Sequence, residues 1–146
     1  MKKTIIKTSI LTIILLAIDI ISKYFFYNKE YLSNLKIINP IMNYGISRGI
    51  QANITMVIII SFLSLFLFLY LFKIKYIGEI CLSLLLAGTL GNMIDRIFLG
   101  GVRDFISIST FPIFNISDIL LNIGILLILI NEFFLLKKSK KSLHYK

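Results

Sequence analysis

The sequence predicts an all-α membrane protein, a bundle of four transmembrane helices with one small extramembrane element. Hydrophobic residues make up 58% of the 146 residues, and the mean hydropathy is +0.90. The apolar residues form long runs, and lysines gather at the ends of these runs. A soluble domain of this size could not bury so much apolar surface, whereas a bilayer acts as an apolar solvent for it.

Four segments are long enough to cross a bilayer, which takes about 20 apolar residues. They lie at about residues 4–26, 54–72, 77–98 and 115–136. The first segment resembles a secretory signal peptide, but no small-x-small cleavage motif follows it, so we expect it to be retained as a helix. The chain shows no internal repeat or low-complexity linker, and we expect residues 1–146 to form a single membrane domain.

The distribution of lysine and arginine predicts that both termini are cytoplasmic. In this orientation ten of the 16 positive charges lie inside and four lie in outer loops. The inner set is Lys2, Lys3, Lys7, Lys73, Lys75, Lys137, Lys138, Lys140, Lys141 and Lys146. The outer set is Lys29, Lys36, Arg48 and Arg103. Membrane topology thus accounts for the net charge of +9, and we expect no nucleic-acid partner.

The outer loop between the first two segments has mixed character. Ile37, Ile38 and Tyr44 alternate loosely with polar residues. This pattern indicates a short strand or an interfacial element on the outer side of the bundle.

All four aspartates of the chain fall toward this outer side. Asp19 and Asp95 lie near the outer ends of the first and third segments, Asp104 lies in the following outer loop, and Asp118 opens the fourth segment. An ionisable group inside a membrane span is costly, and it is a functional candidate by default. The convergence of the four carboxylates therefore indicates a single site.

Two groups of these residues also have purely structural interpretations. Asp19 and Lys23 are four residues apart and can form an ion pair on one helix face. Asn92, Asp95 and Arg96 share a face and could hold helices together by polar contacts, as buried amides do in bilayers.

The last two aspartates differ in this respect. Asn115 and Asp118 are three residues apart and fit a capping box, which would not prevent Asp118 from taking part in chemistry. Asp104 has only its neighbour Arg103 as a nearby partner, and sequence neighbours usually point apart. Asp104 is therefore the aspartate that structure explains least.

The other nucleophiles and bases of the chain are poorly placed for catalysis at this site. His144 lies in the basic C-terminal tail, and Cys81 lies in the inner half of the third segment, so neither a histidine base nor a zinc site is expected near the aspartates. A pairing of Ser22 or Ser47 with Lys23 stays open, although Ser22 and Lys23 are adjacent and face apart. Two carboxylates that share a proton can activate water for peptide hydrolysis without metal or cofactor.

Five short motifs occur along nearly the whole chain. They are Asp19-x-x-x-Lys23, Asn43-x-Gly45, Gly91-Asn92-x-x-Asp95-Arg96, Gly101-Val102-x-Asp104-Phe105 and Phe111-Pro112-x-Phe114-Asn115-x-x-Asp118. Each motif is weak alone, but in this combination and order the sequence resembles the lipoprotein signal peptidase family, also called signal peptidase II.

The resemblance implies an aspartic endopeptidase of the bacterial inner membrane, with Asp104 and Asp118 as its catalytic pair. Because such a pair within one chain needs no partner subunit, we expect a monomer. The supporting and substrate-binding residues of the family map to Asp19, Lys23, Asn43, Gly45, Asn92, Asp95, Arg96 and Asn115. The implied substrate is a prolipoprotein whose lipobox cysteine carries diacylglycerol, cleaved before that cysteine in contact with membrane lipid. The resemblance also implies inhibition by globomycin, and no metal or cofactor.

The sequence departs from the family pattern at three places. Ile20 replaces a usual glutamine, Ile46-Ser47-Arg48 replaces Ala-Ala-Phe, and Ser117 replaces alanine. The catalytic motifs are unchanged, so we expect these departures to affect substrate preference and inhibitor contacts more than activity.

Two other classes of function stay open at this point. Intramembrane carboxylates would also suit a small transporter or a proton relay. A non-catalytic scaffold or immunity factor could use the same aspartates to hold its helices together. Transporter sites, however, tend to lie near the midplane of the bilayer with repeats or broken helices, and neither is evident in the sequence.

Overall fold

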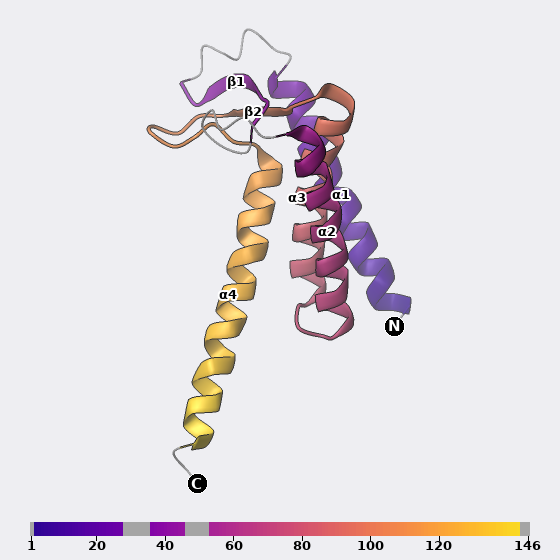
Figure 1. Cartoon of the computed structure of the whole chain (residues 1–146), viewed down its shortest axis with the longest axis vertical. Coiled ribbons are helices and arrows are strands. Elements are labelled where there is room, and N and C mark those ends of the chain that lie inside the picture. The colour runs from indigo at the N-terminus through magenta and orange to yellow at the C-terminus, as the bar shows by residue number, and fades with distance from the viewer. Residues whose placement is uncertain (1, 28–35, 46–52, 144–146) are drawn as a thin grey trace.

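A computed structural model describes residues 2–27, 36–45 and 53–143 as long helices that carry a small antiparallel sheet at one end (Figure 1). The elements are α1 (Lys2–Tyr27), β1 (Ile38–Asn43), α2 (Ile54–Lys73), α3 (Glu79–Leu99), β2 (Val102–Ile106) and α4 (Ile116–Leu143). Several residues considered above lie outside the described ranges: Lys29, Ile46, Ser47, Arg48, His144 and Lys146.

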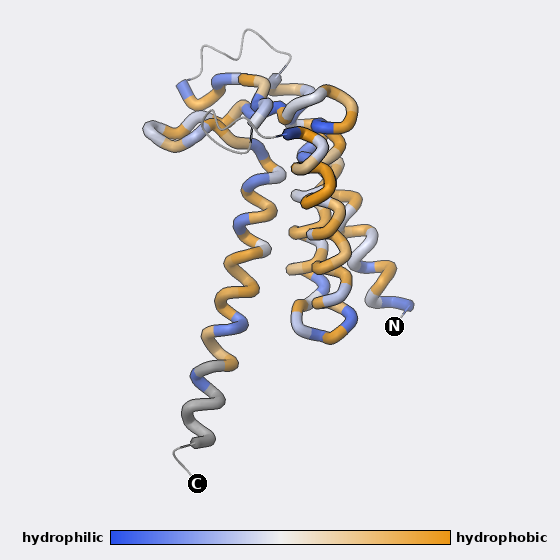
Figure 2. Tube along the Cα trace, viewed as in Figure 1, coloured by the Kyte–Doolittle hydropathy of each residue, from blue (hydrophilic) through white to orange (hydrophobic). Residues whose placement is uncertain are grey.

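The predicted fold class is confirmed, because each of the four helices contains a segment long and apolar enough to cross a membrane. Figure 2 shows hydrophobic residues along the helices and hydrophilic residues gathered near the sheet and at the α2–α3 turn. The third helix begins slightly later than predicted, at Glu79, because Gly78 is its N-cap. The fourth helix continues past the predicted end, to Leu143.

Helix α3 is the centre of the bundle, and α1, α2 and α4 all pack against it. Two clusters of buried apolar side chains hold these helices together. One consists of Ile77, Cys81, Leu82 and Leu85. The other consists of Leu84, Ala87 and Leu120. The buried position of Cys81 among apolar side chains makes it a packing residue.

Helix α1 turns polar side chains inward and apolar side chains outward. Its buried residues are Thr8, Thr12, Asp19 and Lys23. This inverted pattern is expected in a membrane, since lipid solvates isoleucine and leucine as well as a protein core does, while polar groups need partners inside the protein. The polar face of α1 therefore contributes Asp19 and Lys23 to the interior.

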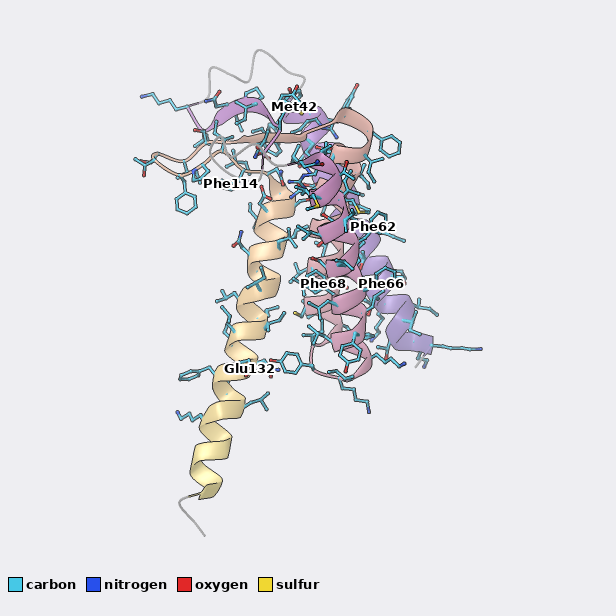
Figure 3. All side chains as sticks on the ribbon, in the orientation of Figure 1. Met42, Phe62, Phe66, Phe68, Phe114 and Glu132 are labelled. Carbon is cyan, nitrogen blue, oxygen red and sulfur yellow. The ribbon has the colours of Figure 1, made fainter. Side chains whose placement is uncertain are left out.

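At the end opposite the sheet, a polar contact links α4 to the α2–α3 turn. The Tyr76 hydroxyl donates to Glu132 of α4, and the Asn131 side-chain amide donates to the Tyr76 carbonyl oxygen at 3.1 Å. Figure 3 shows Glu132 on the side of α4 that faces this turn. The contact fastens α4 far from the aspartates.

Two glycines allow α3 to approach its neighbours closely near the sheet. A Cβ on Gly88 would lie 2.6 Å from the Ser117 carbonyl oxygen of α4. A Cβ on Gly91 would lie 2.4 Å from Asp19 Oδ2 of α1 and 2.1 Å from Ser117 Oγ. These glycines therefore bring α1 and α4 to the same face of α3.

We expect Gly88→Ala to destabilise the protein by about 1–3 kcal/mol, because the added methyl group would overlap backbone that cannot move independently. Gly78→Ala is the control, since nothing lies within 4 Å of a Cβ at that position. Thermal unfolding of the two variants in the same detergent measures the difference. Equal stability of the two variants would contradict the close approach.

The sheet joins the loop after α1 to the loop after α3. Strand β1 pairs antiparallel with β2, and Asn43 lies opposite Val102 and Ile41 opposite Asp104. The predicted strand or interfacial element after the first helix is thus a strand. Asp104 was expected in a loop, but it lies in strand β2, which is five residues long.

Candidate active site

A tight return of the chain brings the Asp104 and Asp118 motifs together. After β2, residues 107–113 form a short excursion, and Phe114 then pairs with Ile106. The Ile106 and Phe114 backbones exchange hydrogen bonds at 2.9 and 3.1 Å. Asn115, which follows Phe114, therefore reaches the side chain of Asp104.

The Asp104 carboxyl group is buried, with 2% of the residue exposed. Asn43 Nδ2 donates to Asp104 Oδ2 at 2.9 Å, and Asn115 Nδ2 donates to Asp104 Oδ1 at 2.6 Å. Asn43 is fixed in turn, since its Oδ1 accepts from the Gly45 backbone N–H at 3.0 Å. The Asn43-x-Gly45 motif therefore orients one of the two amides that hold Asp104.

The Asp118 carboxyl group is half-buried in the first turn of α4. Its Oδ2 accepts from the Asn115 backbone N–H at 3.1 Å, and the Asp118 N–H donates to Asn115 Oδ1 at the same distance. This reciprocal pair confirms the predicted capping box. Asn92 Nδ2 donates to the other oxygen, Asp118 Oδ1, at 2.8 Å.

Asn115 connects the two aspartates. Its backbone N–H binds Asp118 and its side-chain amide binds Asp104, so a single residue sets the relative position of both carboxyl groups. The two carboxyl groups are close enough for the charge of Asp118 to oppose ionisation of Asp104. Such an arrangement favours a state in which the pair holds one proton.

The orientation of Asn92 is determined by donors that face its oxygen. Lys23 Nζ donates to Asn92 Oδ1 at 3.0 Å, and Asn115 Nδ2 does so at 3.1 Å. Because both neighbours are donors, the amide oxygen must face them and the amide nitrogen must face Asp118. Lys23 thus controls the hydrogen bond that Asp118 receives.

Two further carboxylates hold the scaffold of the site. Asp19 lies 2.8 Å from Lys23 Nζ, which confirms the predicted ion pair, and it accepts from the Ser117 backbone N–H at 2.7 Å. Asp95 lies 3.7 Å from the same ammonium. Asp19 therefore ties α1 to the start of α4.

Asp95 is paired mainly with Arg103, through Nη2 at 2.7 Å, Nε at 3.2 Å and the backbone N–H at 3.0 Å. This role of Arg103 was not predicted from the sequence, in which Arg103 stands out only as the neighbour of Asp104. Because successive side chains of a strand point to opposite faces, Arg103 turns to Asp95 while Asp104 turns to its amide partners. This pairing fixes β2 on α3.

Burial raises the pKa of Asp104 to about 6. The amides of Asn43 and Asn115 and the charge of Lys23 act in the opposite direction, since they stabilise the ionised form, whereas the charge of Asp118 adds to the increase. The guanidinium of Arg96 is near enough to Asp104, Asp118 and Asp95 to interact with their charges. A carboxyl group with such a pKa can stay protonated in weakly acidic solution.

The serine–lysine pairing that the sequence left open finds no geometric support in the described residues. Ser22 Oγ donates to the Asp19 carbonyl oxygen at 2.7 Å, so it is directed away from the Lys23 ammonium, and Ser47 lies outside the described ranges. Within these ranges, no three His, Cys, Asp or Glu side chains gather as metal ligands would. The arrangement that remains is a pair of carboxyl groups held by asparagine amides.

The fold and the site together define a multi-pass membrane protein with two adjoining carboxyl groups at one end of its helix bundle. The family model described as signal peptidase (SPase) II matches residues 11–134. The chain belongs to the signal peptidase II family.

Individual relatives agree with this assignment. The lipoprotein signal peptidase of Wigglesworthia glossinidia brevipalpis is 33% identical, over 86% of this chain and 94% of that protein. The lipoprotein signal peptidase of Streptococcus agalactiae serotype Ia is 32% identical, over 89% of this chain and 92% of that protein.

Solved structures show the same fold. A bacterial membrane enzyme determined by the in meso method at 2.3 Å is similar with a TM-score of 0.74 and 30% identity, covering 92% of this chain and 90% of its own. A second bacterial membrane enzyme, determined at 1.9 Å, has a TM-score of 0.70 and 31% identity, covering 85% of this chain and 90% of its own.

Proposed function

We propose that this protein removes the signal peptide from diacylglyceryl-modified prolipoproteins, and that it does so as an aspartic peptidase. The observation that carries the mechanism is the bridging of Asp104 and Asp118 by Asn115, which holds two carboxyl groups in one site. Family membership supports the substrate class. Residues 1–146 act as a single domain and a monomer, since both carboxyl groups come from one chain.

In the proposed reaction, Asp104 is the protonated member of the pair and Asp118 the ionised one. Asp104 is the more deeply buried, and burial disfavours its charged form. Asp118 is the more accessible carboxyl group, lies in the first turn of α4 and accepts two N–H hydrogen bonds, so we assign it the role of the base.

The chemical steps follow from this distribution of the proton. Asp118 takes a proton from water while the water oxygen attacks the scissile carbonyl carbon, and Asp104 donates its proton to the carbonyl oxygen. The tetrahedral intermediate then collapses as the C–N bond breaks, the proton returns from the oxygen to Asp104, and Asp118 gives its proton to the leaving amine. No cofactor is required by this scheme.

The remaining site residues position the pair. Asn43, Asn92 and Asn115 supply N–H groups that fix the carboxyl oxygens. Lys23 of α1 holds the Asn92 amide, and Asp19 and Asp95 lie beside the Lys23 ammonium. Arg96 lies near the carboxylates with its side chain half-buried, and we assign it to binding polar groups of the lipid or the peptide.

Cleavage of a diacylglyceryl-modified prolipoprotein by the purified protein tests the proposed function. Release of the signal peptide with the lipidated cysteine at the new N-terminus supports it, and globomycin should inhibit the release. Absence of cleavage by a folded protein, with carboxylate-dependent proton movement across vesicles instead, would favour the alternative of a proton relay.

The pH dependence of the reaction offers a test of the role of Asp104. We expect kcat/KM to decrease above pH about 6, because the pair loses the proton that it must donate. Asn43→Ala removes an amide that lowers the Asp104 pKa, so the decrease should begin at a higher pH in this variant. Because interacting carboxyl groups titrate together, the comparison uses the complete pH profiles of kcat/KM for the parent and for Asn43→Ala. An unchanged profile, or a shift to lower pH, would contradict the assignment of Asp104 as the acid.

The orientation of the bundle follows from the charge rule, and we infer that both termini are cytoplasmic and the aspartates periplasmic. A reporter that is active only in the cytoplasm should therefore be active when fused after Lys146 and silent when inserted near Gly100. A signal helix with a cytoplasmic N-terminus presents its cleavage site on the outer side. The reverse reporter pattern would place the aspartates on the wrong side for this substrate.

A further inference from the structure

The segment between the two catalytic motifs is unusual for a loop outside a membrane span. No charged residue lies between Asp104 and Asp118, although the chain as a whole has 16% charged residues. The segment instead contains two large apolar side chains that are exposed on the protein, Ile108 at 52% and Phe111 at 71%. A solvated loop would be expected to carry polar side chains at such positions.

These side chains belong to an ordered turn. The Phe111 N–H donates to the Ile108 carbonyl oxygen at 3.0 Å, and the Ser107 N–H donates to the Ile37 carbonyl oxygen at the same distance. Ile37, which precedes β1, is itself 59% exposed. We call Ile37, Ile108 and Phe111, which lie beside the end of the sheet where Ile38 pairs with Ile106, the apolar patch.

The position of the turn relative to the helices indicates what covers this patch. In Figure 1 the segment between β2 and α4 projects sideways beyond α4, near the level at which α4 begins. Helix α4 is a membrane span whose outward side chains, such as Ile123 and Leu126, are exposed on the protein and face lipid. The patch therefore lies beside the boundary at which the lipid-facing surface of α4 ends.

We propose that the apolar patch inserts into the lipid interface of the leaflet nearest the aspartates and anchors β2 at that depth. Apolar side chains beside an uncharged, hydroxyl-bearing segment suit this interfacial region, where aromatic rings are favoured. The turn is tied to the site by the Ile106–Phe114 pairing, two residues from Asp104 and one from Asn115. Lipid contact at the patch thus sets the depth at which the two carboxyl groups meet the membrane.

The anchoring inference does not depend on the proposed reaction, and its test needs no activity. The chain contains no tryptophan, so Phe111→Trp introduces a single fluorescent probe at the patch. The variant is reconstituted into vesicles whose phospholipids carry bromine near the glycerol end of the acyl chains. We expect blue-shifted emission, strong quenching by the brominated lipid and weak quenching by aqueous acrylamide.

Two references calibrate this measurement. Phe98→Trp replaces a side chain that is 78% exposed near the end of the α3 span, and it gives the signal of a lipid-facing probe. N-acetyltryptophanamide in buffer gives the signal of a probe in water. Emission of Phe111→Trp that matches the aqueous reference would overturn the proposal.

A second variant tests whether the turn itself contacts lipid or whether the introduced tryptophan draws it there, since tryptophan favours the membrane interface. Adding Ile108→Asn to Phe111→Trp should reduce lipid quenching and increase acrylamide quenching, because the patch loses one of its apolar side chains. Unchanged quenching in this pair would overturn the role of the patch. Shielding of Phe111→Trp from both quenchers would also overturn the proposal, since it would indicate that protein, from a second copy or another partner, covers the patch.

Discussion

Asp104→Asn and Asp118→Asn are each expected to reduce prolipoprotein cleavage by at least about 10²–10⁴-fold, the range that a general acid or base contributes. Neither amide can take up or release a proton in the way that the proposed steps require. Asn at position 104 would also place an N–H group against Asn43 or Asn115, since both neighbours donate to the Asp104 carboxyl oxygens. Cleavage by purified variants in lipid micelles measures the loss.

The double variant gives a sharper criterion than either single variant. If the two carboxyl groups act as a unit, as proposed, Asp104→Asn combined with Asp118→Asn should be no slower than the slower single variant. Glu132→Gln, the same chemical change at the far end of α4, is the control and should cleave normally. Thermal unfolding shows whether each single variant is folded. Substantial cleavage by a folded single variant would refute the assignment of Asp104 and Asp118 as a catalytic pair.

The helices and one end of the site could be predicted because local signals determine them. In lipid, the backbone N–H and C=O groups of four such long apolar segments must find their hydrogen-bond partners within the segment, and a helix provides them. The capping box between Asn115 and Asp118 depends on residues three apart, and the structure has it as predicted. The pairing of Asp19 with Lys23 is local in the same way.

Other parts of the site depend on contacts that sequence spacing does not reveal. Strand β2 forms because β1, far earlier in the chain, supplies its partner, so its five residues carry no independent signal. Asp95 has Arg96 beside it on α3, yet its bidentate partner is Arg103, which the strand directs back toward the helix. The donation from Asn43 to Asp104 requires the same sheet.

Ser117 shows how a departure from the family pattern is accommodated. Its side chain is fully buried, and its backbone N–H serves Asp19. The Oγ atom lies where a Cβ on Gly91 would be, so the absence of a side chain on α3 leaves space for the hydroxyl group. The Ser117 hydroxyl group is therefore part of the contact between α3 and α4, and it forms no hydrogen bond with either candidate carboxyl group.

Lys23→Met is expected to destabilise the protein by about 3–5 kcal/mol, the cost of removing one partner from a buried ion pair. Lys23 and Asp19 are both 0% exposed, and their charged atoms are 2.8 Å apart. Methionine fills a similar volume but leaves the Asp19 carboxylate, among the described residues, with the Ser117 N–H as its hydrogen-bond partner. The loss of Lys23 affects Asp95 less, because Asp95 keeps its ion pair with Arg103.

Reversible denaturation in detergent measures this cost, and a second substitution identifies its origin. Asp19→Asn combined with Lys23→Met removes both charges while an oxygen remains to accept the Ser117 N–H, so most of the lost stability should return. The exposed Lys7→Met is the control and should stay within about 0.5 kcal/mol of the parent. If the double variant were less stable than Lys23→Met alone, the unpaired charge of Asp19 would not be the cause of the lost stability.

Activity should not return with stability in this double variant. Lys23 Nζ is one of the two donors that turn the Asn92 oxygen away from Asp118. Without it, the Asn92 amide can rotate, and Asp118 then loses the N–H that holds its Oδ1. We therefore expect the double variant to fold but to have a lower kcat than the parent. If Lys23 contributed to stability alone, the double variant would cleave the substrate as fast as the parent.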